Sequence, residues 1–555
     1  MKKEFFIQHR DKIIPVFFFL LLLGISFFVL PEYPLWITDN GNKYMMVRQF
    51  LLNNTPFFTH LEPALFPYGG FHFQQLASGK IVSFHPVYLP FLSSWCVRFL
   101  GISWVNLIPM LCGAAMVWLT MQFRRKDPVP LILLAGTTVL IFYSLLQWEM
   151  VPAALAVLAS GYCFYKKRTV FAGLFFGCGV WMREELYLLG AILVIVLAIR
   201  RSWREIFHFG CGAGVPVLLL WLTNWQIYGN ILGIHGSDYF SNNRGNEVFG
   251  WGTILKDSTF NCYQHLLRFE TLGKFSKIAV WFAVIPALVA GMAPGFKAWS
   301  KFKVAAGVVF TANVALLTVG LWHEKSLLFT SAVTMGFFIS MPGLLGMMLN
   351  WRAMLFCRNR NISLASWVLF IFIFAIPPLM NMHDIGLTWG ARHYIVVSGI
   401  AVLLGCYAWR ASGLMMGRKR LLFTGVIMLG VSMQLWGLTA LKKVAGDSAA
   451  VEKILLAKKS DMVITDLFFI PEMTPGIMSE KIVLEVASEA QYRILPEFLQ
   501  RNKKTSFTLI LSPRYRRMSN EFLAGLLSAY PVQRPPEKMV IGNSLEIFIA
   551  DCQKR

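Results

Sequence analysis

The chain has 555 residues, of which 56% are hydrophobic and only 15% are charged, whereas soluble domains carry about 25% charged residues. Together with a mean hydropathy of +0.56, this composition excludes an ordinary soluble protein of this length. The formal net charge is +23, but the cations stand in short clusters between apolar blocks. Because there is no basic face with interleaved aromatic residues, nucleic acid is not an expected partner.

The apolar residues fall in blocks of about 17–23, the length at which a helix crosses a hydrocarbon core of about 30 Å. The sequence therefore predicts a mainly α fold, a multi-pass transmembrane helix bundle of about thirteen spans. The first block, Ile13–Leu30, lacks a small-residue cleavage site and is expected to be a retained helix rather than a signal peptide. The expected spans are 13–30, 102–123, 129–147, 150–165, 169–182, 185–199, 206–223, 278–295, 304–321, 327–349, 364–380, 393–409 and 421–440.

Basic clusters occupy alternate connections between these spans. By the positive-inside rule, the side that carries them is cytoplasmic, which places the N-terminus in the cytoplasm. The clusters are Lys2/Lys3/Arg10/Lys12, Arg124/Arg125/Lys126, Lys166/Lys167/Arg168, Arg200/Arg201/Arg204, Lys297/Lys301/Lys303, Arg352/Arg358/Arg360 and Arg410/Arg418/Lys419/Arg420.

Two connections on the opposite, outer side are long, about 31–101 and about 224–277. After the last span the pattern changes, and residues 441–555 are expected to form a small α/β domain outside the cytoplasm, distinct from a membrane module of residues 1–440. The strands expected there are 462–466, 482–486, 506–512 and 544–550, and the expected helices are 488–501 and 518–530.

Candidate functional residues begin just past the first span. Asp39 stands at the start of a helical pattern, where it either caps that helix or presents a carboxylate that binds a metal or removes a proton. His85 precedes Pro86 at the start of an amphipathic segment, 86–99, and is either a functional residue or a polar residue of the interface.

Further charges lie at the outer ends of later spans, where they are expensive and usually face a cavity or one another. Glu149 lies between the third and fourth spans. Arg183 and Glu184 lie between the fifth and sixth, and either form a pair with a folding role or present Arg183 to an anionic ligand such as phosphate. The segment 384–393 contains Arg392, which either approaches a lipid head group or anchors the interface.

Taken in order, several motifs resemble the GT-C superfamily of membrane glycosyltransferases over about residues 10–410. This superfamily uses polyprenyl- or dolichyl-phosphate sugars and includes protein mannosyltransferases and the aminoarabinose transferases of lipid A. The motifs are the acidic residue of the first outer segment, His-Pro-x-Tyr-Leu-Pro at 85–90, the turn at 143–149, Gly173–Gly177 leading to Arg183-Glu184, Asn224–Gly233 and Trp-Gly-Ala-Arg-His-Tyr at 389–394.

The resemblance implies an inverting transfer of a hexose or pentose from a lipid-phosphate donor to a glycan, lipid or protein acceptor. It implies that this occurs at the outer face of a membrane, which we expect to be a bacterial inner membrane. Asp39 matches the acidic residue that binds a divalent metal, such as Mg²⁺ or Mn²⁺, or deprotonates the acceptor. Glu149 is the candidate second carboxylate.

The same reaction needs cations near the lipid phosphate, which leaves as an anion. The candidates are Arg183, Arg392 and Lys43. The chain departs from family members that have paired acidic residues in the first outer segment, because Asn40 follows Asp39. Metal dependence is therefore open. The remaining candidate site residues are Glu62, which could supply the missing carboxylate, and His85, Glu184 and His393.

Two other classes of protein compete with the enzyme. A transporter or flippase of a lipid-linked substrate would often show paired halves with interrupted helices, and the sequence shows no matching halves. A non-catalytic scaffold with a receptor-like outer domain would leave the charged clusters at the outer span ends without an explanation.

Overall fold

The computed structural model describes most of the chain, and every statement below refers to the residues it describes. These are 2–31, 38–58, 60–66, 73–76, 78–83, 85–123, 129–233, 273–292, 297–323, 337–379, 392–411, 420–467, 469–513, 516–541 and 545–554. The chain divides into two compact units. The helical unit comprises Met1–Gly24, Ile108–Glu324 and Ser331–Thr439, and the mixed unit comprises Ile25–Leu107, Lys325–Thr330 and Ala440–Arg555.

The described chain is mainly helical, and five helical stretches are long and apolar enough to cross a membrane. They are Ile102–Phe123, Trp203–Tyr228, Lys301–Gly320, His393–Ala411 and Leu421–Ala457, and shorter apolar helices accompany them at Lys12–Phe28, Met150–Tyr165, Thr169–Val180, Glu185–Ile199, Trp281–Met292 and Arg360–Ile376. This composition confirms the predicted multi-pass membrane protein. The count of about thirteen spans stays a prediction.

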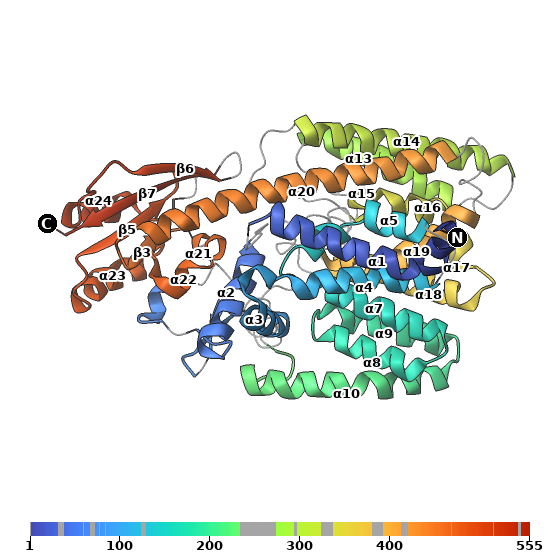
Figure 1. Cartoon of the computed structure of the whole chain (residues 1–555), viewed down its shortest axis with the longest axis horizontal. Helices are drawn as coiled ribbons and strands as arrows, with labels where there is room; N and C mark the ends of the chain where they lie inside the picture. Colours follow the sequence, from blue (N-terminus) through green and yellow to red (C-terminus); the bar gives the residue numbers. More distant parts are fainter. Residues whose placement is uncertain are drawn as a thin grey trace, which may run out of the picture. The chain divides into compact units, whose positions relative to one another are not determined.

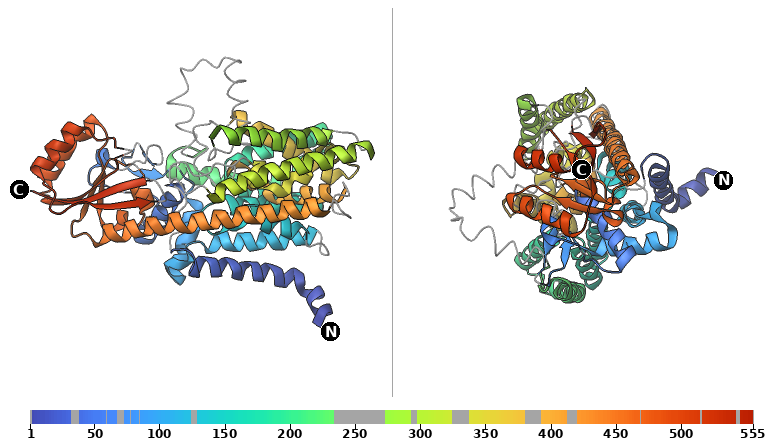
Figure 2. Two further views of the ribbon diagram at one scale, coloured as in Figure 1. Left: turned by 90° about the horizontal axis from the view of Figure 1, so that it is seen from above. Right: turned by 90° about the vertical axis from the view of Figure 1, so that its left-hand side faces the viewer.

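The helices of the membrane portion follow the predicted blocks closely (Figure 1). In chain order they are α1 (Lys2–Phe28), α4 (Leu107–Phe123), α5 (Val129–Thr137), α6 (Leu140–Ser144), α7 (Met150–Tyr165), α8 (Thr169–Val180), α9 (Glu185–Ile199), α10 (Trp203–Tyr228), α13 (Gly273–Met292), α14 (Lys297–His323), α15 (Phe337–Ser340), η3 (Pro342–Leu344), α16 (Leu345–Met348), α17 (Trp351–Leu355), α18 (Arg360–Leu379), η5 (Arg392–Val397), α19 (Ser398–Ala411) and α20 (Arg420–Ala457). Figures 1 and 2 show α13 and α14 side by side.

Small residues let α8 and α10 pack closely within the helical unit. A Cβ atom at Gly173 would lie 2.0 Å from the carbonyl oxygen of Phe209, and one at Gly212 would lie 1.9 Å from that of Val170. Glycine is therefore required at both positions, as at small-residue contacts between membrane helices generally.

Two predicted spans are not continuous helices. The span expected at 129–147 divides into α5 and α6, where the Thr138 hydroxyl accepts a hydrogen bond from the Leu140 amide and replaces a helical bond. The span expected at 327–349 is described only from Phe337 onward. There it divides into α15, η3 and α16, because Pro342 cannot donate the hydrogen bond that a continuous helix needs.

The mixed unit contains a five-stranded sheet in the order β4-β3-β5-β7-β6. Strands β3 (Met462–Thr465), β4 (Ile482–Glu485) and β5 (Ser506–Leu511) are parallel neighbours, whereas β6 (Glu537–Ile541) and β7 (Leu545–Gln553) add an antiparallel edge. This confirms the predicted C-terminal α/β fold, although the sequence analysis missed β6. The helices of the sheet region are α21 (Ile470–Met473), α22 (Ile477–Glu480), α23 (Glu489–Arg501) and α24 (Asn520–Ala529).

The first long outer segment belongs to the same unit as this sheet. It contributes α2 (Thr38–Asn53), η1 (Pro63–Leu65), β1 (Phe73–Gln75), β2 (Ile81–Ser83), α3 (Tyr88–Leu100) and η2 (Ile102–Trp104). Leu65 is fully buried in the core of the sheet region. His60 Nε2 lies 3.1 Å from the carbonyl oxygen of Val483, and Arg501 binds Glu62 at 2.7 Å. The compact unit therefore contains residues 25–107 as well as the C-terminal residues.

Candidate active site

Four titratable side chains meet in the helical unit around the N-terminal ends of α7 and α9. Arg183 Nη1 lies 2.9 Å from Glu149 Oε1, and Arg183 Nε lies 2.9 Å from Glu185 Oε2. His393 Nδ1 contacts Glu185 Oε1, the oxygen that Arg183 Nη2 also contacts. Both carboxylates and His393 are buried, and the Arg183 side chain is 13% exposed.

The helix order explains how these residues meet. Chain direction reverses between α7 and α8 and again between α8 and α9, so α7 and α9 begin at the same end. Glu149 is the residue that precedes α7, and Glu185 is the first residue of α9. A carboxylate at a helix N-terminus is favoured by the helix dipole and the free amides there. The cluster contains two carboxylates and one guanidinium, so protonation of His393 would make it neutral.

The structure places three of the candidate residues next to one another and gives Arg183 a different partner from the one considered. It brings Glu149, Arg183 and His393 together, although they are far apart in the chain. The considered pair of Arg183 with Glu184 is wrong, because Arg183 binds Glu149 and Glu185 while Glu184 is exposed. The sequence analysis missed Glu185, because two adjacent glutamates at a helix start cannot be told apart without knowing which one faces inward.

A second group of buried polar residues lies on α2 in the mixed unit. Asp39 is 8% exposed and Lys43 is fully buried. Residues four apart lie on the same side of a helix, so α2 presents this carboxylate and this ammonium together. Lysine is almost never fully buried in soluble proteins unless it has a specific role or partner. Asp39 is also in the first turn of α2, where the helix dipole attracts negative charge.

The contact of α2 with α21 is close. The Asn42 amide donates a 3.1 Å hydrogen bond to Glu472 Oε1, and both side chains are buried. A Cβ atom at Gly41 would lie 1.5 Å from the backbone oxygen of Glu472. The helix that carries Asp39 and Lys43 is therefore seated directly on the backbone of α21.

The remaining candidates differ in their surroundings. Glu62 is in an ion pair with Arg501 at 2.7 Å, and its side chain is 21% exposed. His85 is half-buried just before α3, and its backbone amide donates to the Ser83 hydroxyl. Arg392 begins η5, and its side chain lies outside the described residues, as does the segment 384–391.

The described residues do not fit a divalent metal. Among them, no group of three or more His, Cys, Asp or Glu side chains has the spacing of a metal site. Mg²⁺ is usually bound through carboxylate oxygens, substrate phosphates and several waters. Asp39 therefore has no accompanying set of ligands in the described residues, and no metal-dependent step is derived below.

These observations define a membrane protein of many apolar helices, with a small α/β unit and a buried charged cluster at two helix N-termini. The solved structures that this chain resembles include two crystal structures of ArnT from Cupriavidus metallidurans, one bound to undecaprenyl phosphate and one in the apo state. Each is 12% identical to this chain over 97% of both chains, with TM-scores of 0.43 and 0.41.

No family model and no curated protein sequence matches this chain. At this identity and TM-score, the likeness assigns neither a substrate nor the role of any residue, so the function proposed next depends on the residues of the chain itself.

Proposed function

We propose that this protein is a membrane glycosyltransferase. It transfers a sugar from a polyprenyl-phosphate donor to an acceptor at the outer face of a bacterial inner membrane, with inversion at the anomeric carbon. The observation that carries the proposal is the pair of buried, oppositely charged side chains, Asp39 and Lys43, on one side of α2. This pair lies at the position where the motif order of the GT-C superfamily expects the acidic residue.

The chemistry assigned to α2 is a single displacement. The Asp39 carboxylate accepts the proton of the acceptor hydroxyl as its oxygen bonds to the anomeric carbon of the sugar. The bond between that carbon and the lipid phosphate breaks, and the phosphate departs as an anion that keeps the electron pair. Attack on the face opposite the leaving group inverts the carbon. General-base assistance of this kind contributes about 10²–10⁴-fold in rate.

Cations stabilise the departing phosphate in this proposal. Lys43 is a buried ammonium on the same helix as the base, and a charge at a desolvated site interacts more strongly than in water. Arg183 and Arg392 are the other proposed phosphate ligands. Glu149 and Glu185 engage three of the five N–H donors of the Arg183 guanidinium, so two donors remain for a phosphate oxygen.

The cluster around Arg183 has a positioning role in the same proposal. Glu149 is 2% exposed and is held by Arg183, which also binds Glu185. A direct ion pair with a cation offsets part of the cost of burying a carboxylate. We therefore assign Glu149 as the second carboxylate, which orients a hydroxyl of the donor sugar or of the acceptor.

The first experiment identifies the reaction. Envelope lipids and glycans are compared by mass spectrometry in cells with and without the chain. A mass difference of one hexose, pentose or aminosugar is expected, and it names the class of sugar and the acceptor. No difference in any envelope component, in cells where the protein is present in the membrane, would refute the proposed function.

The second experiment tests the base. Asp39→Asn keeps the size of the side chain but removes its basicity, so we expect transfer to fall by about 10²–10⁴-fold. The control is Glu497→Gln, which neutralises an exposed carboxylate of α23 in the same compact unit. Equal thermal stability of both variants shows that folding is intact. Undiminished transfer by Asp39→Asn would overturn the mechanism.

A further inference from the structure

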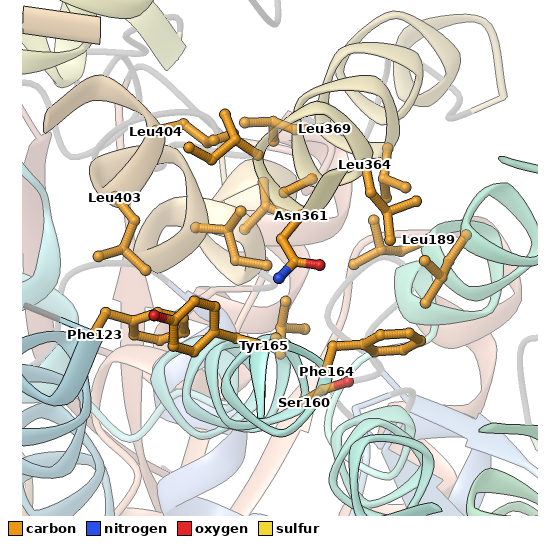
Figure 3. A pocket seen from close by; sticks show the side chains of 18 of the residues that line it. Phe123, Ser160, Phe164, Tyr165, Leu189, Asn361, Leu364, Leu369, Leu403 and Leu404 are labelled. Carbon is orange, nitrogen blue, oxygen red and sulfur yellow. The ribbon is translucent and has the colours of Figure 1, made fainter. Parts of the chain in front are cut away.

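The helical unit contains an apolar cavity of about 300 Å³ that the proposed reaction does not use. It lies between α7, α9, α18 and α19, with contributions from Phe123 of α4 and Phe176 of α8. In Figure 3, Leu364, Leu369 and Leu404 lie on one side of the space and Phe164 and Tyr165 on the other, with Asn361 between them.

The lining has a polar end and an apolar end. Tyr165 is the last residue of α7, Asn361 is the second residue of α18, and Tyr407 lies near the end of α19. These polar residues occupy the ends of the helices that adjoin the basic connections. Leu189 and Leu369 line the cavity further along α9 and α18, toward the middle of the bundle.

Cations surround the polar end. Lys166 follows Tyr165, and its ammonium lies 5.6 Å from the centre of that ring. Arg358 and Arg360 flank Asn359, which also lines the cavity, and all three are exposed. Arg200 donates to the Ser363 hydroxyl at 2.8 Å and to the Arg360 carbonyl at 3.2 Å, which joins the basic ends of α9 and α18.

The dimensions fit one hydrocarbon chain of one leaflet. From Asn361 to Leu369, the lining of α18 extends eight residues, about 12 Å at 1.5 Å per residue. Half of a hydrocarbon core of about 30 Å is about 15 Å. A volume of 300 Å³ is at the lower limit of ligand pockets, so it holds a single chain and leaves the rest of a lipid in the bilayer.

We propose that this cavity binds an anionic phospholipid of the leaflet on the basic side. One acyl chain occupies the apolar end, and the phosphate head group lies between Lys166 and Arg358, beside Arg360, whose guanidinium also pairs with Glu205 at 3.0 Å. Basic pockets between transmembrane helices on this side of a membrane are suited to anionic head groups. The proposal is independent of the glycosyltransferase activity, because it requires only binding.

The test uses the purified full chain after its lipids have been removed by detergent exchange. Phosphatidylglycerol or phosphatidylcholine with identical acyl chains is added, and retained lipid is counted by native mass spectrometry. We expect one phosphatidylglycerol to be retained in preference to phosphatidylcholine, with a higher melting temperature for that complex. Equal retention of the two lipids, or no retention, overturns the proposal.

Two variants locate the site. Ala365→Phe places a ring in the cavity and is expected to reduce retention about tenfold or more, whereas Leu316→Phe adds the same ring on an exposed face of α14 and is expected to change nothing. Arg358→Ala removes an exposed cation and is expected to weaken retention about fivefold. Its control, Arg534→Ala, removes an exposed cation of the mixed unit.

Each outcome decides the proposal. Because Arg358 is exposed, its variant reports on the site even if Ala365→Phe fails to fold. Retention that is unchanged in a folded Ala365→Phe or in Arg358→Ala overturns the assignment of the cavity. Displacement of phosphatidylglycerol by an equal concentration of polyprenyl phosphate also overturns it, because the cavity would then belong to the sugar donor.

Discussion

The close seating of α2 on α21 makes a sharp prediction for Gly41→Ala. The new Cβ atom would lie 1.5 Å from the backbone oxygen of Glu472 and 2.9 Å from its Cα atom. Real Cβ contacts below 3.0 Å are essentially never observed. Because the obstacle is backbone, no side-chain rotation relieves the clash, and α2 must move away from α21 by more than an ångström.

The cost of this movement has two parts. Overpacking against a rigid neighbour costs about 1–3 kcal/mol. Separation of the helices also breaks the buried hydrogen bond between Asn42 and Glu472, and unsatisfied buried polar groups cost about 1–3 kcal/mol. We therefore expect Gly41→Ala to lower the free energy of unfolding of the mixed unit by roughly 2–6 kcal/mol.

Gly525→Ala is the matched control. Gly525 is also inside a helix, α24, in the same compact unit, and no described atom lies within 4 Å of its Cβ position. Replacement of glycine by alanine in a helix interior stabilises by about 0.5–1 kcal/mol. The two variants share this gain in helix propensity, so the difference between them isolates the contact with Glu472.

The assay is thermal unfolding of the purified protein in detergent, together with limited proteolysis of α2. Gly41→Ala should unfold at a lower temperature than the wild type and expose α2 to cleavage, and Gly525→Ala should do neither. If Gly41→Ala is as stable as Gly525→Ala, α2 does not lie against the backbone of α21 as described.

Two further predictions concern buried titratable groups. Burial lowers the pKa of His60 below its ordinary 6.5, and this effect outweighs the carbonyl oxygens that face its ring and raise the pKa. As the pH falls, the unfolded chain therefore binds the proton before the folded chain does. The free energy of unfolding should be highest above pH 6.5 and should fall as the pH drops through that value. A pH series of melting temperatures checks this, and an identical slope in His60→Asn would assign it to another group. Arg183→Met leaves two buried carboxylates without their cation and should lower the free energy of unfolding by about 3–5 kcal/mol. Glu184→Gln should change it by less than about 0.5 kcal/mol. Matched melting curves decide, and equal melting temperatures would contradict the ion pairs of Arg183.

The long apolar blocks were predictable because helix length and hydrophobicity both point to a span. The expected 185–199 and 150–165 coincide with α9 and α7. The helix of the sheet region at 488–501 was also found. Its start is fixed locally, since Ser488 and Gln491 form a capping box that the sequence itself encodes.

Breaks and extensions were harder to predict. Hydrophobicity averaged over a window is not lowered by Pro342 and predicts a continuous span there, whereas the helix is interrupted at that residue. In the opposite direction, α20 continues to Ala457 rather than ending near residue 440, because its sequence turns polar without a proline to end the helix. Strand β6 was missed because its alternation is weak and most of its residues are exposed at the sheet edge.

In the candidate site, too, the sequence indicated which residues matter but not which of them meet. Charged residues at span ends could be selected from sequence, since burial of charge near a membrane needs a reason. Their pairing could not, because Glu185 and His393 are 208 residues apart and meet only through the packing of α7, α9 and η5. The close contact of Gly41 with Glu472 likewise depends on two segments more than 400 residues apart.

The joining of the first outer segment to the sheet also constrains how the protein is made. His60 and Glu62 leave the ribosome long before their partners Val483 and Arg501, which follow 423 and 439 residues later. At about 5–20 residues per second, the early segment waits roughly 20–90 seconds for them. During that time Leu65 has no sheet to cover it, so this segment is a natural substrate for a chaperone. A nascent chain arrested before the final strands would expose the same segment to proteases.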